Sequence, residues 1–231
     1  MNYQEVVEGI FIERPNRFVA YCEIEGTVYK VHVKNTGRCR ELLLPGVTVY
    51  LEKSDNPKRK TPYSLIAVEK GSLLINMDSQ APNIVVEEAL SAGQIELPGI
   101  SAPLNYIKRE QVYGQSRFDF YCEAGNEKIF IEVKGVTLED EGVVRFPDAP
   151  TERGIKHIEE LIKARSEGYH SYILFVVQMG EAHYFTPHGA KHPEFEEALK
   201  KAAEAGVGVL AYTCDVTPSE LMIKEQIPVQ L

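Results

Sequence analysis

The sequence lacks three features that would each point to a particular class of protein. Its four cysteines are far apart and form no Cys-x-x-Cys pair, which argues against a structural zinc site and predicts reduced, partly buried thiols. No run approaches the roughly eighteen apolar residues of a membrane span. The first residues lack the positive region and apolar stretch of a signal peptide. These absences predict a cytoplasmic protein with no membrane partner.

Several motifs of catalysis and nucleotide binding are also missing. There is no Gly-x-x-x-x-Gly-Lys, no Gly-x-Gly-x-x-Gly and no Gly-x-Ser-x-Gly, so nucleotide hydrolysis, dinucleotide binding and serine-hydrolase chemistry lack their usual parts. His183, His188 and His192 are read as structural or solvated, because a strand, a proline and a glycine turn separate them. The 231 residues, 44% of them hydrophobic, can form one large domain or two small ones.

Positive charge is scarce overall but concentrated in one stretch. The net charge is −9, yet residues 30–60 carry eight basic side chains against three acidic ones, a net of +5 that leaves −14 for the rest. A local basic patch matters more for phosphate binding than the total charge does. The same stretch could also be an ordinary solvated face.

The first eighty residues alternate short strand patterns with turns. In 27–34, Tyr29, Val31 and Val33 point to one side, with Lys30, His32 and Lys34 on the other. This pattern predicts an OB-like basic β-barrel domain over 1–80. Asn35-Thr-Gly-Arg38 reads as a turn whose arginine could contact a phosphate. The predicted strands are 6–13, 17–25, 27–34, 47–53, 63–70 and 72–76.

Helix and strand patterns mix from residue 81 onward. Pro82-Asn83 opens a predicted helix and Thr151 caps another. The order predicts a mixed-sheet α+β or α/β domain over 81–231. Segment 171–178 is almost entirely apolar, which predicts a strand buried on both faces. The predicted helices are 83–92, 152–166 and 193–205, and the other predicted strands are near 106–113, 116–123, 128–137, 182–186 and 207–213.

The most informative pattern is a predicted β-hairpin over 117–134. A type II′ turn at Gly125-Asn126 would place Asp119 opposite Glu132 and Arg117 opposite Lys134, with Phe118 and Phe120 on the other face. Facing carboxylates repel, so the pair favours a cation between them, and Mg²⁺ accepts one or two carboxylates plus substrate phosphates. The alternative is a solvated Asp119 paired only with a neighbouring basic residue.

A second polar group lies on the predicted helix 152–166. Arg153, Lys156, His157 and Glu160 recur at spacings of three and four, opposite an apolar stripe. They could form a solvent-exposed set with internal ion pairs. A helix directly after the carboxylate strand could instead direct Arg153 and Lys156 toward the phosphates of a bound strand.

Five blocks of sequence carry a resemblance to a known family. They are the segments 32–38, 41–43, 113–119, 132–138 and 146–157, for example Glu-Val-Lys-Gly-Val-Thr-Leu at 132–138. In order, and over almost the whole chain, they resemble the sugar fermentation stimulation protein family, SfsA. The resemblance implies an N-terminal OB-like domain, a second domain similar to the PD-(D/E)xK restriction-endonuclease-like nucleases, and DNA binding of low sequence specificity.

The nuclease pattern can be carried over position by position. It implies that Glu88, or less favourably Glu87, joins Asp119 and Glu132 in binding Mg²⁺ or Mn²⁺, while Lys134 orients the attacking water. The Pro-Asp dipeptide of the pattern is absent, because a phenylalanine precedes Asp119. The residues predicted to contact nucleic acid are Lys30, His32, Lys34, Asn35, Arg38, Arg117, Arg153, Lys156 and His157.

Three functions remain open on the sequence alone. The first is a metal-dependent DNA endonuclease or exonuclease, and the second is a non-catalytic DNA-binding regulator of sugar metabolism genes on a nuclease scaffold. The third is an interaction protein that binds neither metal nor DNA. The DNA partner could be single- or double-stranded, and the chain could form a homo-oligomer.

Overall fold

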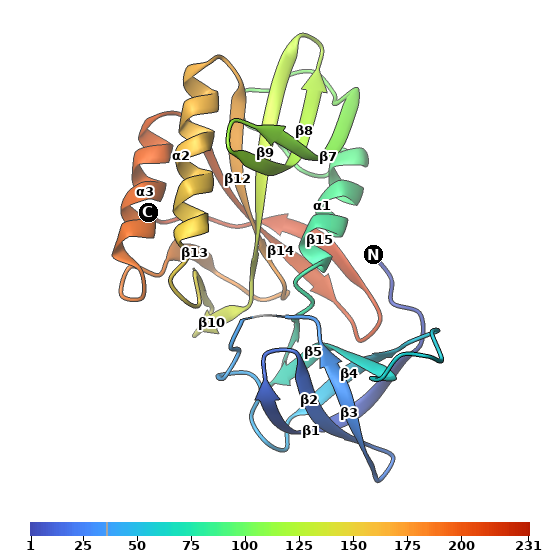
Figure 1. Ribbon diagram of the computed structural model, residues 1–231. Helices are drawn as coiled ribbons and strands as arrows, with labels where there is room; N and C mark the ends of the chain where they lie inside the picture. The colour runs from blue at the N-terminus through green and yellow to red at the C-terminus, as the bar shows by residue number, and fades with distance from the viewer. Residues whose placement is uncertain (36) are drawn as a thin grey trace.

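The computed structural model describes residues 1–35 and 37–231, which form a β-barrel followed by a mixed α/β unit (Figure 1). Thr36, within the predicted 35–38 turn, lies outside the described residues. The barrel strands pair in the order β3-β2-β1-β4-β5-β6, and parallel pairing of β3 with β5 closes the barrel. They are β1 (Val6–Asn16), β2 (Val19–Ile24), β3 (Thr27–Val33), β4 (Thr48–Lys53), β5 (Tyr63–Lys70) and β6 (Leu73–Asn76).

Alternation along β3 shows why this sequence forms a barrel. Val31 and Val33 are buried in the barrel core, while Lys30 is exposed on the other face. A period of two buries one set of side chains and leaves the other in water. The predicted OB-like barrel is therefore confirmed.

The second unit is built on a sheet ordered β15-β14-β12-β9-β8-β7, in which β9, β12 and β14 run parallel. Helix α1 packs against one face, and α2 and α3 pack against the other (Figure 1). The main elements are α1 (Ala81–Ser91), β7 (Tyr106–Tyr113), β8 (Ser116–Ala124), β9 (Glu127–Val136), α2 (Glu152–Ser166), β12 (His170–Val177), α3 (Pro193–Glu204), β14 (Gly208–Val216) and β15 (Leu221–Gln226). A smaller sheet contains β10 (Leu138–Asp140), β11 (Val143–Phe146) and β13 (Tyr184–Pro187).

The strong local signals in this unit are confirmed. Thr151 caps α2 by accepting a hydrogen bond from the Gly154 N–H at 3.0 Å. Strand β12 is buried on both faces, as its apolar run predicts. The sequence does not indicate strands β10, β11 and β15. Strand β10 pairs with the neighbouring β11, and β15 pairs with the preceding β14, while β11 also pairs in parallel with β13, which is distant in sequence.

Polar contacts and a shared core join the barrel to the second unit. The Asn76 N–H donates to the carbonyl of Gln178 at 2.9 Å, and the Gln178 Nε2 donates back to Asn76 Oδ1 at 3.0 Å. Lys70 Nζ lies 2.6 Å from Glu139 Oε2. One continuous apolar cluster runs from the barrel interior to the α2 side of the sheet. The barrel is thus held in a fixed position beside the C-terminal half of β9.

Candidate active site at the end of the β8–β9 pairing

The predicted hairpin forms with the predicted register. Phe120 pairs with Ile131 and Ala124 pairs with Glu127, which leaves Gly125-Asn126 as the two-residue loop. Gly125 has a φ of +60°, whereas Asn126 does not adopt a positive φ, as a type II′ turn requires.

All four cysteines are free and buried, as expected.

The β8–β9 ladder stops at Asp119, one step beyond the Phe120 pair. In a continued ladder the Val133 N–H would donate to the Phe118 carbonyl, but it donates to Asp119 Oδ2 at 2.8 Å instead. On the other side of β8, Glu110 has a φ of +56° and the regular β7–β8 pairing skips it. A non-glycine residue in this conformation is a local strain of the kind found at functional sites.

This interruption corrects one part of the sequence interpretation. Phe118 packs with the α2 side of the sheet, while Phe120 packs with the α1 side, so the two rings do not share a face. The physical reason is that the Asp119 side chain takes the place of a ladder hydrogen bond and the strand turns over there. Arg117 is exposed and lies 3.4 Å from Glu110 Oε2 rather than opposite Lys134.

Three side chains form a compact charged cluster beside the interrupted ladder. Glu132 is 2% exposed, and its Oε1 contacts both Lys134 Nζ and His157 Nδ1. Its other oxygen, Oε2, is buried and has no hydrogen-bond partner among the described residues. A carboxylate oxygen that is buried without a partner destabilises the folded state unless a ligand binds to it. Glu132, Lys134 and His157 are hereafter called the Glu132 cluster.

Asp119 and Glu132 have opposite pKa shifts. Burial, and then the nearby charge of Glu132, raise the pKa of Asp119 above its ordinary value. Burial also opposes ionisation of Glu132, but His157 and Lys134 outweigh it and hold the pKa of Glu132 below its ordinary value. Glu132 therefore lies close enough to Asp119 to oppose its ionisation.

Helix α1 contributes an amide to the site rather than a carboxylate. Asn83 Nδ2 donates to Asp119 Oδ1 at 2.9 Å. Glu88, which the family pattern places at the site, has its Oε2 2.6 Å from the N-terminal amine, and its side chain is 55% exposed. Glu87 pairs with Arg109 at 3.2 Å. No group of three or more His, Cys, Asp or Glu side chains in residues 1–35 and 37–231 is arranged to hold a metal ion.

Helix α2 carries two exposed cations, of which Arg153 lies next to the Glu132 cluster and Lys156 donates to the Gln115 carbonyl at 3.3 Å. Arg153 and Lys156 are exposed, and Arg153 Nε lies 3.4 Å from His157 Nε2. His157 itself is 6% exposed and contacts Glu132, so it belongs to the cluster and not to a nucleic-acid surface. The spacing of polar residues along α2 could not reveal this, because the burial of His157 depends on how the helix packs against β9.

The barrel residues predicted to bind nucleic acid are used in different ways. Lys34 is paired with Glu52 at 2.8 Å and with Asp78 at 3.2 Å, so its charge is already neutralised. The Asn35 side chain donates to the Met77 carbonyl and accepts from the Gly37 N–H, which makes it a structural residue. Burial, with the charges of Arg59 and Lys34, lowers the pKa of His32. Lys30 and Arg38 remain exposed.

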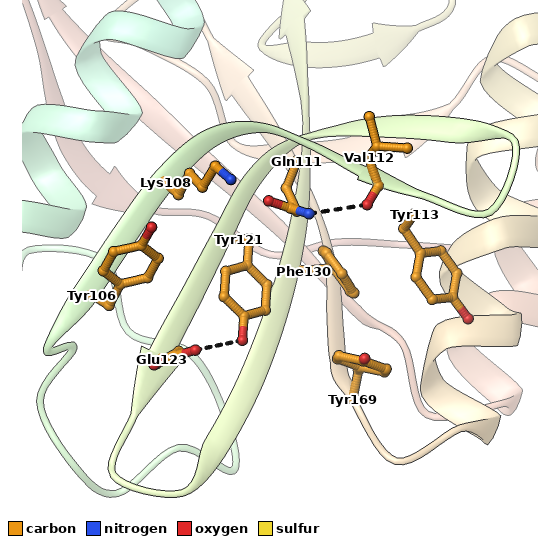
Figure 2. A pocket seen from close by; sticks show the side chains of 9 residues that line it. All are labelled: Tyr106, Lys108, Gln111, Val112, Tyr113, Tyr121, Glu123, Phe130 and Tyr169. Carbon is orange, nitrogen blue, oxygen red and sulfur yellow. Dashed lines mark hydrogen bonds between the residues drawn. The ribbon is translucent and has the colours of Figure 1, made fainter.

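Two hollows lie near the cluster. A cavity of about 200 Å³ between the barrel and the sheet is lined by Asn35, Gly135, Asp148 and Gln178, so it directly follows Lys134 along β9. Figure 2 shows the other, a groove of about 470 Å³ at the β7 edge, with aromatic rings from β7, β8 and β9 along it. We call it the aromatic groove; its rings are Tyr106, Tyr113, Tyr121, Phe130 and Tyr169.

The rings of the aromatic groove form a continuous series. Tyr106 and Tyr121 have centroids 6.2 Å apart, and Phe130 follows at 5.4 Å from Tyr121. Tyr169 lies 4.9 Å from Phe130 (Figure 2). Phe130 precedes Glu132 by two positions on β9, and its ring lies in the cluster that packs with α2. The groove is therefore next to the Glu132 cluster along the strand.

Sequence reasoning missed Asn83 and the aromatic groove. The only signal for Asn83 was its place in the first turn of a helix, and the tyrosines are spread from 106 to 169.

None of the helices in the described ranges is long and apolar enough to cross a membrane.

Comparisons with known proteins agree with this architecture. Residues 12–77 match the model described as the SfsA N-terminal OB domain, and residues 80–220 match the sugar fermentation stimulation protein RE domain. The sugar fermentation stimulation protein homolog of Ruminiclostridium cellulolyticum is 53% identical over 231 residues, with all of both chains covered. The homolog of Clostridium beijerinckii is 52% identical with the same coverage.

A solved structure is also similar over the whole chain. It is that of Pyrococcus furiosus SfsA in complex with Ca²⁺, and it matches with a TM-score of 0.88 and 29% identity, covering 100% of this chain and 98% of that one. With two family models and full-length relatives in agreement, this chain belongs to the sugar fermentation stimulation protein family.

Proposed function

We propose that the protein hydrolyses phosphodiester bonds in DNA with the help of a divalent cation, Mg²⁺ or Mn²⁺. The observation that carries this proposal is the buried Glu132 Oε2 without a partner, beside Lys134 and an Asp119 that is anchored to the adjoining strand. The residues present fit such an ion, because Mg²⁺ is commonly bound by one or two carboxylates and completes its shell with water and substrate phosphates.

Each residue has a role that its contacts support. Asp119 and Glu132 would hold the cation, which when bound would stabilise negative charge on the phosphoryl oxygens. Asn83 and the Val133 N–H fix Asp119, and His157 fixes Glu132 from the opposite side. Lys134 is 15% exposed at its side chain, so its ammonium group remains accessible to orient water and to balance developing charge.

The surroundings of the cluster support nucleic acid as the substrate. Arg153 and Lys156 are exposed on the first turns of α2, where they could contact phosphates. The aromatic groove offers ring faces on which unpaired bases could stack. The Pyrococcus furiosus protein was solved in complex with Ca²⁺, which is consistent with a divalent cation in this fold.

A cleavage assay with matched variants tests the proposal. Supercoiled plasmid, linear duplex and single-stranded DNA are incubated with Mg²⁺ or Mn²⁺ and the wild-type protein, Glu132→Gln, Lys134→Ala or Glu88→Gln. We expect cleavage by the wild type and by Glu88→Gln, because the Glu88 carboxylate is paired with the N-terminal amine, and a loss of at least about tenfold in the other two. Circular dichroism confirms that each variant is folded. Equal activity in wild type and Glu132→Gln would refute the proposal.

A non-catalytic DNA-binding role is the second candidate. It is favoured by the finding that no third carboxylate joins Asp119 and Glu132 in the described part of the chain. In that case the wild type would bind DNA with strong salt dependence, since neutralised phosphates release counterions, yet it would leave every substrate intact.

A further inference from the structure

A third hollow lies on the barrel, separate from the Glu132 cluster. It has a volume of about 680 Å³ and lies between the β1–β2 hairpin and the segment that follows β3. Four arginines line it, against the single acidic side chain of Glu13. We call it the arginine pocket; its arginines are Arg14, Arg17, Arg38 and Arg40.

One of these arginines builds the wall of the pocket. Arg14 donates to the backbone carbonyls of Asn35, Arg17 and Arg38 at 2.6, 2.8 and 2.8 Å. These bonds tie the tip of the β1–β2 hairpin to the segment after β3. The protein's own hydrogen bonds therefore fix the two walls of the pocket relative to each other.

The other three arginines are available to bind a ligand. Arg17, Arg38 and Arg40 are exposed, and none lies within 4.0 Å of a carboxylate in residues 1–35 and 37–231. The guanidinium of Arg17 also lies over the ring of Phe18, with 5.8 Å to its centroid. One guanidinium group can donate two parallel hydrogen bonds to a phosphate. Three guanidinium groups without a carboxylate partner around one hollow therefore favour a ligand with more than one phosphate.

The floor of the pocket is apolar, which adds a second requirement for the ligand. Pro15 and Pro45 line the pocket and are exposed, while Phe11 and Leu43, at 2% and 7% exposed, form the core beneath them. A duplex could offer this surface only its phosphates, because its bases are paired and stacked. An unpaired nucleotide would present both a flat apolar base and phosphates.

The pocket also adjoins the segment that leads to the Glu132 cluster. Ala149 lines the pocket, and the chain continues from it through Thr151, the cap of α2, to Arg153 and His157. A strand lying in the pocket would thus meet the exposed cations of α2 next.

We infer that the arginine pocket binds an unpaired nucleotide of single-stranded DNA, with the base against Pro15 and Pro45 and the phosphates on Arg17, Arg38 and Arg40. The choice of DNA rests on the proposed function, while the need for an unpaired base comes from the pocket itself. The pocket would then select single-stranded DNA or frayed ends over intact duplex.

Binding without divalent ions tests this inference independently of cleavage. Fluorescence anisotropy in EDTA follows a labelled oligothymidine of about twelve nucleotides, an oligomer of the same length with abasic sites, and a hairpin duplex. The triple variant Arg17→Gln, Arg38→Gln, Arg40→Gln is compared with a control that loses the same charge from exposed sites elsewhere, Lys128→Gln, Lys191→Gln, Lys224→Gln.

The expected results separate the base from the phosphates. The wild type should bind oligothymidine more tightly than the abasic oligomer at every salt concentration, because the abasic oligomer keeps the phosphates and loses the bases. The arginine variant should lose about tenfold or more relative to the lysine control at the same salt concentration. Equal binding of the abasic oligomer, or of the two triple variants, would overturn the inference.

Cleavage of the same oligomers in Mn²⁺ by the wild type is measured alongside. Intact oligomers together with pocket-dependent binding would remove the proposed catalysis and support the pocket. Cleavage together with unchanged binding by the arginine variant would support the catalysis and remove the pocket.

Discussion

Replacement of Lys134 by methionine tests the electrostatics of the Glu132 cluster most directly. The side chains of Lys134 and Glu132 are 15% and 3% exposed, so the variant leaves a buried carboxylate with only His157 beside it. Removing one partner of a buried ion pair costs about 3–5 kcal/mol, and His157 should keep the loss near the lower value. For a chain of this size each kcal/mol lowers Tm by about 2–4 °C. We therefore expect a decrease of about 6–12 °C.

Divalent ions give the second half of this prediction. Without the lysine, Asp119 and Glu132 should attract a cation more strongly, so Mn²⁺ should raise the Tm of Lys134→Met more than that of the wild type. Saturation at a hundred times Kd adds about 2.7 kcal/mol of stability. Differential scanning calorimetry with and without Mn²⁺ measures both effects.

A second lysine serves as the control for this experiment. Lys224 is 40% exposed, and its nearest carboxylate oxygens are 3.6 and 3.7 Å away, so Lys224→Met should change stability by less than about 0.5 kcal/mol. Equal Tm values for the two variants would refute the account of the cluster. A Mn²⁺ shift that persists in Glu132→Gln would show that the ion binds elsewhere.

Three further predictions concern the Lys70–Glu139 ion pair between the two units, Gly135 on β9, and the exposed cations of α2. Burial opposes ionisation of Glu139, but Lys70 and the Gly142 N–H outweigh it and hold the pKa of Glu139 below its ordinary value. Their contribution to stability is therefore present at neutral pH and is lost as the pH falls through the folded-state pKa. The Tm difference between wild type and Lys70→Met should shrink on acidification. Gly135→Ala should destabilise the protein by about 1–3 kcal/mol in urea titrations, because a Cβ there would lie 2.6 Å from a buried glutamine oxygen. Arg153→Gln with Lys156→Gln should weaken DNA binding on all sequences and reduce the salt slope by about 2; an unchanged slope would remove these cations from the interface.

The partners of Glu87 and Glu88 show what a sequence pattern leaves open. On a helix, Glu87 and Glu88 point in directions about 100° apart, and only the packing of α1 decides which neighbours each one meets. The N-terminal amine takes Glu88, Arg109 takes Glu87, and Asn83, one turn earlier, reaches Asp119. The N-terminus and β7 are distant in sequence, so no local pattern contains this information.

The strand faces of the barrel and the hairpin register followed from the sequence alone, because alternation within a strand and the turn of a hairpin are local features. Alternating side chains set the faces of β3, and Gly125-Asn126 set the pairing that leads to Phe120 and Ile131. The interruption at Asp119, the burial of His157 against Glu132 and the gathering of arginines around one hollow were decided by tertiary structure. Each of these joins segments from different strands or helices, and such contacts form only when the packed core fixes their distance and orientation.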